Sequence, residues 1–325
     1  MLKRTFKAKL SWLLACFMIV FLLPVFIENE FYLQFLTSSA IIAISVIGFD
    51  LLTGYTGYVS FGHAGFMGIG AYTFALLVVK VGMNFWFALL LAVIFTGFIA
   101  YLVSIPTFRL SGIYFSIGTL AFSQIFYAIV YNWTSLTGGA FGLSGINTPF
   151  TLTGYYYFTF TSLFIIGLLV NRIVKSPIGK ALGSIKENEK LANSVGVDTI
   201  GIKRFTFTIS GIIGGFAGAI LVGLVQFASP NSFNLSMSLE YLVITVVGGA
   251  GTLIGPAVAA FGLNLLGQYL AQFQELRLAL YGLILVLVIM FLPGGVMGSM
   301  KRKVWASKRR QRSESSVAVK STQFE

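Results

Sequence analysis

Charged residues are scarce in this chain. Only 10% of its 325 residues are Asp, Glu, Lys or Arg, whereas soluble domains carry about 25%. Hydrophobic residues make up 57% of the sequence, and 36 residues are glycine. This composition excludes an ordinary soluble enzyme. It indicates an integral membrane protein, in which the structural unit is a span of about 20 apolar residues.

Cysteine and histidine occur once each, as Cys16 and His63. One cysteine excludes an intramolecular disulfide, and this pair is too small for a metal site built from several His and Cys ligands. A phosphate-binding G-x-x-x-x-G-K-[ST] loop is also missing, because Gly179-Lys180 is followed by Ala181 and lacks the earlier glycine. We find no nucleophile–base pair either. The sequence predicts no catalytic residue, no metal ligand and no cofactor in this chain.

The charges that are present are mostly positive, with 22 basic and 10 acidic residues and a net charge of +12. The basic residues form three main clusters, in residues 3–9, 172–204 and 301–320. Clustering between apolar runs is typical of cytoplasmic segments under the positive-inside rule. It predicts cytoplasmic termini and contact with the lipid bilayer, and no binding of nucleic acid. A basic tail that binds anionic lipid is the alternative interpretation.

Long apolar runs follow one another along most of the chain. They cover residues 11–27, 31–52, 64–80, 85–106, 110–131, 156–174, 204–227, 239–271 and 278–297. The first run continues without a cleavage site, so we interpret it as an uncleaved span. The run 239–271 is too long for one span, and its glycines suggest two crossings or a re-entrant pair.

These runs predict an all-α fold. We expect a polytopic integral membrane helical bundle of about 8–10 transmembrane segments with glycine-rich broken helices. Residues 1–298 form the transmembrane domain, with a cytoplasmic loop at 175–203. Residues 299–325 are basic and rich in serine, and are predicted to be a disordered cytoplasmic tail.

Two glycine-rich breaks interrupt the apolar runs. Six glycines lie from Gly54 to Gly70, and a second group lies from Gly248 to Gly255. An acidic residue precedes each break, Asp50 before the first and Glu240 before the second. Small residues let helices approach closely, and a broken helix can line a polar path. Both uses remain open at this point, and they can coexist.

Polar residues near the first break are the candidates for a transport path. Asp50 lies either inside the membrane, where an ionisable group is a functional candidate, or at the cytoplasmic edge as a helix cap. His63 is either a packing and hydrogen-bonding residue or a substrate contact or proton carrier. The full candidate set is Asp50, Tyr55, Thr56, Gly57, Ser60, Gly62, His63, Thr119 and Gln124.

The loop 175–203 has helical character of its own. Ser176-Pro177 can start a helix, and Gly196 can stop it. Apolar residues between them recur at near-helical spacing, which predicts one or two short amphipathic helices. Such helices suit docking into a groove of a partner, with a merely solvated connector as the alternative.

Four sequence blocks resemble the permease of branched-chain amino acid ABC importers of the LivM type, a family that also contains urea and short-chain amide permeases. The blocks occur in the expected order and together cover most of residues 45–265. They are Gly54-Tyr55-Thr56-Gly57 with Ser60-Phe61-Gly62-His63-Ala64 and Gly68-Ile69-Gly70-Ala71-Tyr72, Arg109-Leu110-Ser111-Gly112-Ile113-Tyr114-Phe115 with Thr119-Leu120-Ala121-Phe122, Ser176-Pro177-Ile178-Gly179-Lys180-Ala181 through Gly196-Val197, and Gly248-Gly249-Ala250-Gly251-Thr252-Leu253-Ile254-Gly255-Pro256.

The resemblance implies a multi-pass subunit of the bacterial inner membrane. Its partners would be a second, similar permease, two cytoplasmic ABC ATPase subunits that carry ATP and Mg²⁺, and a periplasmic binding protein on the outer loops 132–155 and 228–238. The loop 176–197 would couple the chain to an ATPase. The residues implied in this coupling are Gly179, Lys180, Ile185, Glu187, Asn188, Glu189, Ala192 and Gly196.

The resemblance implies transport of branched-chain amino acids, with urea or short-chain amides as an alternative. The block Thr137-Gly138-Gly139 also matches the family, but the following Ala140-Phe141 departs from it. Two functions of other kinds compete with the importer. One is a proton-coupled secondary transporter with Asp50 and His63 as a relay. The other is a membrane-embedded enzyme, against which the missing catalytic constellation counts.

Overall fold

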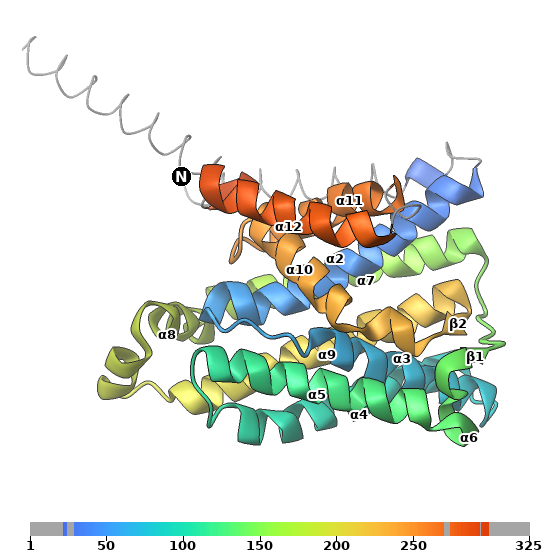
Figure 1. Ribbon diagram of the computed structural model, residues 1–325, viewed down its shortest axis with the longest axis horizontal. Helices are drawn as coiled ribbons and strands as arrows, with labels where there is room; N and C mark the ends of the chain where they lie inside the picture. The colour runs from blue at the N-terminus through green and yellow to red at the C-terminus, as the bar shows by residue number, and fades with distance from the viewer. Residues whose placement is uncertain (1–21, 25–28, 270–273, 293, 299–325) are drawn as a thin grey trace, which may run out of the picture.

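The computed structural model describes residues 22–24, 29–269, 274–292 and 294–298. Most of the expected first span 11–27, with Cys16, lies outside the described residues, and so does the tail 299–325. The described part is almost entirely helical (Figure 1), which confirms the all-α prediction.

The helices follow the apolar runs. The long helices are α2 (Glu30–Thr56), α4 (Phe85–Thr107), α5 (Ile113–Asn132), α7 (Leu152–Lys175) and α9 (Thr199–Val225), and each is long and apolar enough to cross a membrane. Shorter apolar helices are α3 (His63–Val79), α10 (Leu235–Gly248) and α11 (Ile254–Tyr269), and α12 spans Gln274–Phe291. The chain is a multi-pass membrane protein.

Short elements gather at one end of the bundle, opposite helix α8 (Pro177–Ser194) (Figure 1). They are α6 (Thr134–Thr137), the 3₁₀ helices η1 (Gly139–Phe141) and η2 (Pro230–Phe233), and strands β1 (Leu143–Ser144) and β2 (Phe227–Ala228). The two strands pair antiparallel, with Leu143 opposite Ala228. The predicted outer loops therefore lie together, far from the predicted cytoplasmic loop.

The run 239–271 forms two helices, as its glycines predicted. Helix α10 ends where Gly249 and Gly251 adopt positive φ angles of 107° and 80°, a region that favours glycine. Helix α11 then runs back along α2, where Asn264 Nδ2 donates to Ser39 Oγ over 2.8 Å. The result is a helical hairpin packed on α2.

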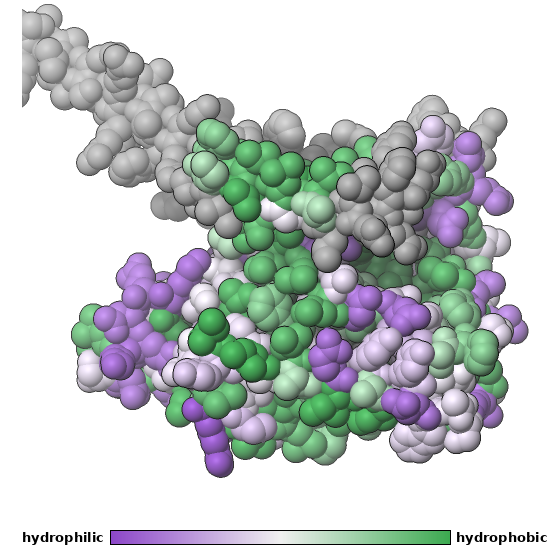
Figure 2. Space-filling view, viewed as in Figure 1, coloured by the Kyte–Doolittle hydropathy of each residue, from purple (hydrophilic) through white to green (hydrophobic). Residues whose placement is uncertain are grey.

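The surface of the bundle is apolar over much of its area. Figure 2 shows hydrophobic residues across the helices and hydrophilic residues gathered over α8. Helix α4 exposes a row of large apolar side chains, Phe87, Leu90, Ile94, Phe98 and Tyr101. Apolar side chains on the outside are favourable where lipid rather than water is the solvent.

Helix α9 lies inside the bundle and packs on α2, α3 and α4. Its closest approach to α3 depends on glycine. A Cβ atom at Gly218 would meet the backbone of Met67, and one at Gly70 would meet the backbone of Gly215. Small residues at such contacts let helix backbones approach closely in a membrane.

We expect Gly218→Ala to lower the melting temperature of the purified protein in detergent. The added methyl group must displace the α3 backbone, at a cost of about 1–3 kcal/mol. Gly167→Ala is the matched control, because its Cβ would meet nothing within 4 Å and alanine favours a helix by about 1 kcal/mol. Equal melting temperatures for the two variants would contradict this packing.

Candidate translocation and coupling site

The first glycine-rich break is an extended stretch that turns back into the bundle. Helix α2 ends at Thr56, and the following Gly57 caps it with a φ of 80° and donates its N–H to Thr53 O. Helix α3 begins at His63, whose Nε2 lies 3.1 Å from Ser45 O in the middle of α2. Between Gly57 and His63 the chain therefore returns along α2 by about 11 helical residues, a distance of about 16 Å. We call residues 57–62 the re-entrant segment.

Hydroxyl groups from α5 and α10 pair with the backbone on both sides of Phe61. Ser238 Oγ donates to Phe61 O over 2.9 Å and accepts the N–H of Ala64 over 3.2 Å. The other contacts are Phe61 N–H to Thr119 Oγ1, 3.0 Å, and Ser116 Oγ to Val59 O, 2.7 Å. An unsatisfied backbone group costs several kcal/mol at membrane depth, so these hydroxyls are what permits an extended segment there.

The glycines at the start of α3 pack closely against α5. A Cβ atom at Gly62 would lie 3.0 Å from Thr119 O, one at Gly65 would lie 3.2 Å from Ser123 Cα, and one at Gly68 would meet the ring of Phe126. Close packing therefore accounts for these three positions. The use of the break as a path is a separate prediction that this packing leaves open.

His63 is enclosed between helices. Its side chain is 2% exposed. Its Nε2 lies 3.0 Å from Ser45 Oγ, and its Nδ1 lies 3.5 Å from Ser210 Oγ. The rings of Phe49 and Tyr241 contact it edge-on. Across the described helices, no hydrogen bond joins His63 to Asp50.

Asp50 joins the two glycine-rich breaks. Its fully buried carboxylate accepts the N–H of Gly251 over 2.7 Å and that of Leu253 over 3.4 Å. These N–H groups lie at the start of α11, where the helix dipole favours a negative charge. Gly54 also lies directly against Gly251, because a Cβ there would meet the Gly251 nitrogen. Asp50 thus caps a helix other than its own.

Helix α8 consists of two halves, which confirms the prediction of short helices in this loop. Ser176 Oγ accepts the N–H of Ile178 over 3.2 Å and caps the first half, with Pro177 at its start. Asn188 is extended, with φ −159° and ψ 101°, and its Oδ1 accepts the N–H of Leu191 over 3.0 Å. We call residues 177–187 the first half and residues 189–194 the second half.

The apolar stripe of α8 divides between two directions. Leu182, Ile185 and Ala192 are buried in the bundle, whereas Leu191 is 61% exposed and Val195 is 72% exposed. The implied coupling residues divide in the same way. Ile185 and Ala192 face inward, Gly179 and Glu189 are half-buried, and Lys180, Glu187, Asn188 and Gly196 are exposed.

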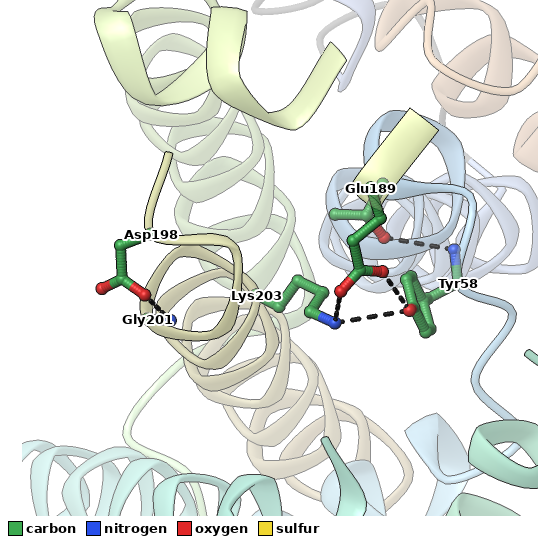
Figure 3. Close-up of polar contacts among 6 residues, drawn as sticks. Tyr58, Glu189, Asp198, Gly201 and Lys203 are labelled. Atoms are coloured by element: carbon green, nitrogen blue, oxygen red, sulfur yellow. Dashed lines mark hydrogen bonds and ion pairs between the residues drawn. The ribbon is translucent and has the colours of Figure 1, made fainter. Parts of the chain in front are cut away.

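Glu189 connects the second half of α8 to the re-entrant segment (Figure 3). Its carboxylate accepts hydrogen bonds from Tyr58 Oη and from Lys203 Nζ at the start of α9. Lys203 is 3% exposed, lies 3.3 Å from Tyr58 Oη, and stands 4.7 Å above the ring of Tyr58 and 5.3 Å from that of Phe108. We call Tyr58, Glu189 and Lys203 the cytoplasmic triad.

The Glu189 carboxyl keeps its charge in this position. Partial burial by itself would raise its pKa, but the hydrogen bonds from Lys203 and Tyr58 and the charge of Lys203 outweigh burial and hold the pKa below its ordinary value. The contact with Lys203 is therefore ionic at neutral pH.

A second contact ties α8 to the end of α2. Lys186 Nζ, from the first half, donates to Gly54 O over 2.6 Å. Sequence reasoning missed Tyr58, Lys186 and Lys203, as well as Ser116 and Ser238. A lysine beside an apolar helix is counted first as a topology signal, and isolated serines in apolar helices mostly bond their own helix.

The remaining candidate path residues make local hydrogen bonds or lie partly or fully exposed. Thr56 Oγ1 donates to Leu52 O, and Ser60 Oγ accepts the N–H of Gly62 over 3.3 Å. Tyr55 is half-buried at the end of α2, and Gln124 is exposed on α5. The structure brings together the residues of the first break but leaves Gln124 on the outside of the bundle.

We expect Ser238→Ala to loosen the re-entrant segment, because it leaves Phe61 O and the Ala64 N–H without their partner. Each unsatisfied buried group costs about 1–3 kcal/mol. Hydrogen exchange of the purified protein should become faster at residues 61–64. Ser162→Ala removes only a bond to Phe158 O of its own helix, so it should leave this exchange unchanged. Equal exchange in the two variants would refute the assignment.

Comparison with known proteins identifies relatives for most of the chain. Residues 31–289 match the family described as branched-chain amino acid transport system, permease component. The high-affinity branched-chain amino acid transport system permease protein LivM of Salmonella typhimurium is 32% identical, over 90% of this chain and 76% of the relative. LivM of Escherichia coli is 32% identical, over 80% of this chain and 68% of the relative.

A more distant relative transports a different class of solute by name. The ribose import permease protein RbsC of Bacillus subtilis is 27% identical, over 54% of this chain and 58% of the relative. No solved structure matches the chain significantly. The family match covers both glycine-rich breaks, helix α8 and the cytoplasmic triad. The chain belongs to the family of permease components of branched-chain amino acid transport systems.

Proposed function

We propose that this chain forms one half of the translocation path of an ABC importer for branched-chain amino acids. The observation that carries the proposal is the contact of Glu189 on α8 with Tyr58 of the re-entrant segment. It joins a helix outside the spans to a break inside them, which a coupling mechanism requires. The relatives whose names include branched-chain amino acid transport support the choice of solute.

The second half of α8 offers a docking surface for an ATPase subunit. Leu191 within it and Val195 directly after it are large, apolar and exposed. A short helix with apolar residues on its outer face suits insertion into a groove of a partner. ATP and Mg²⁺ would be bound by two such subunits, and this chain would carry no catalytic residue or cofactor.

Helix α5 offers a surface for a second permease subunit. Gln124 is exposed on it, between the exposed apolar residues Ile117, Ile125 and Ile129. A polar amide is unfavourable in lipid, so this face suits contact with another subunit or with a water-filled path. The solute would pass between the two permeases.

The two ends of the bundle take different roles in this proposal. A periplasmic binding protein would dock on the end formed by α6, η1, β1, β2 and η2, within the loops 132–155 and 228–238. Closure of the ATPase subunits would act on α8 at the opposite end. The chain would lie in the bacterial inner membrane with both termini cytoplasmic. Residues 1–298 would form the permease domain, and residues 299–325 a basic cytoplasmic tail.

We expect a tagged chain to co-purify with an ATPase and a second permease from mild detergent. Leu191→Asp with Val195→Asp should release the ATPase, because two charges would enter an apolar contact. Val81→Asp is the control, since Val81 is 64% exposed but lies between α3 and α4, outside α8. Mass spectrometry and an ATPase assay of the eluate measure the result. Retention of the ATPase by the double variant would refute docking at this surface.

Uptake into proteoliposomes separates the importer from its rivals. The assembled complex with a binding protein should accumulate radiolabelled leucine inside the vesicles only when ATP is enclosed with it, on the side of the membrane that carries the ATPase subunits. ATP-dependent accumulation of urea or acetamide instead of leucine would refute the proposed solute and support the proposed ATP-driven import. Uptake by the isolated chain under a proton gradient alone would overturn the importer and leave Asp50 and His63 as residues to mutate.

A further inference from the structure

The two halves of α8 bind the chain before and after Gly57. Lys186, in the first half, donates to Gly54 O in the last turn of α2. Glu189, in the second half, accepts from Tyr58 Oη in the re-entrant segment. Gly57 lies between these two attachment points and has a φ of 80°. Asn188 lies between the two halves of α8 and interrupts the helix.

We infer that Gly57 and Asn188 are paired pivots, and that Glu189 and Tyr58 transmit movement of the second half of α8 to the re-entrant segment. Lys203 is the positioning residue that holds Glu189 in place. This inference deepens the proposed function and rests on it. It assigns the transmission to two side chains rather than to the bundle as a whole.

The first half of α8 is suited to remain fixed. Leu182 and Ile185 are buried in the bundle, and the Lys186 ammonium group holds the end of α2 over 2.6 Å. The end of α2 is fixed in turn by Asp50, which accepts from Gly251 on the second break. A movement that begins at the exposed Leu191 therefore meets a fixed neighbour at residue 187.

The second half of α8 buries fewer side chains in the bundle than the first half does. Its main polar contact is the one that Glu189 makes within the cytoplasmic triad. Ala192 is its only side chain that is fully buried within residues 189–194. Glu189, by contrast, shares a charge-assisted contact with Lys203, whose ammonium group is almost completely buried. Such contacts are stronger than neutral hydrogen bonds, and a buried ammonium group left without its partner is costly. Lys203 therefore keeps Glu189 in contact with Tyr58 while the second half of α8 moves.

The re-entrant segment is suited to respond. An extended segment has no helical ladder of its own, and a few hydroxyls hold it at Val59 and Phe61. Tyr58, whose Oη donates to Glu189, directly follows Gly57 in the chain. Glycine adopts left-handed and right-handed conformations with similar ease, so the backbone can rotate at this position without steric strain.

The test uses the complete importer in proteoliposomes, with a binding protein and radiolabelled leucine. We expect Tyr58→Phe and Glu189→Gln each to lower leucine uptake by about tenfold, a typical coupling factor, while the assembled complex keeps its ATP hydrolysis. The number of ATP molecules hydrolysed per leucine should rise accordingly. Tyr101→Phe is the matched control, because Tyr101 is 51% exposed on α4.

A double variant identifies the pair as one unit. If Glu189 acts through Tyr58, combining Tyr58→Phe with Glu189→Gln should lower uptake no further than either change alone. Lys203→Met should give the same uncoupling, since it frees Glu189 from its position. Additive losses, or an unchanged ratio of ATP to leucine in assembled single variants, would overturn the inference.

Assembly and transport are measured separately, so that two kinds of failure can be distinguished. If the wild-type complex shows no ATP-driven leucine uptake, the proposed function itself fails. If the wild type transports but the variants do not assemble, hydrogen exchange of the wild-type complex tests the inference instead. Addition of ATP and vanadate should change the exchange of residues 57–62 together with that of residues 189–194. A change confined to α8 would overturn the inference.

Discussion

Backbone groups at membrane depth must find partners inside the protein, and this constraint organises the structure around the re-entrant segment. Lipid offers no hydrogen-bond partner, and an unpaired N–H or C=O at membrane depth costs several kcal/mol. Ser116, Thr119 and Ser238 supply the partners from α5 and α10. The positions of these two helices are therefore linked to the conformation of residues 57–62. A change in one requires a change in the other.

The same constraint explains a buried carboxylate in a span. Asp50 would be costly if unpaired, but it accepts from Gly251 and Leu253 at the start of α11. One side chain thereby pairs with two backbone N–H groups of the second break and positions that break beside the first. This contact accounts for the burial of Asp50 and for the position of Gly251 beside Gly54. It gives Asp50 a structural role that needs no proton transfer to His63.

Polar contacts continue from the breaks to the surface of α8. Lys186 reaches the end of α2, and Glu189 reaches the re-entrant segment through Tyr58. Lys203 neutralises Glu189 and packs on the rings of Tyr58 and Phe108. The proposed coupling mechanism needs such a connection, because α8 lies outside the spans while the breaks lie within them. The two glycine-rich breaks and α8 are best understood as one connected site.

The sequence by itself determined the helical fold, most helix positions and the caps of α8. Apolar runs must form helices in lipid, where each backbone group pairs within its own segment, and Ser176 and Pro177 act through neighbours in the chain. Only the tertiary structure decided which side chains meet across the bundle. Asp50 and Gly251 lie 201 residues apart, and Tyr58 and Glu189 lie 131 apart. Local periodicity carries no information on such pairs, because they depend on how the helices pack and at what depth each one breaks.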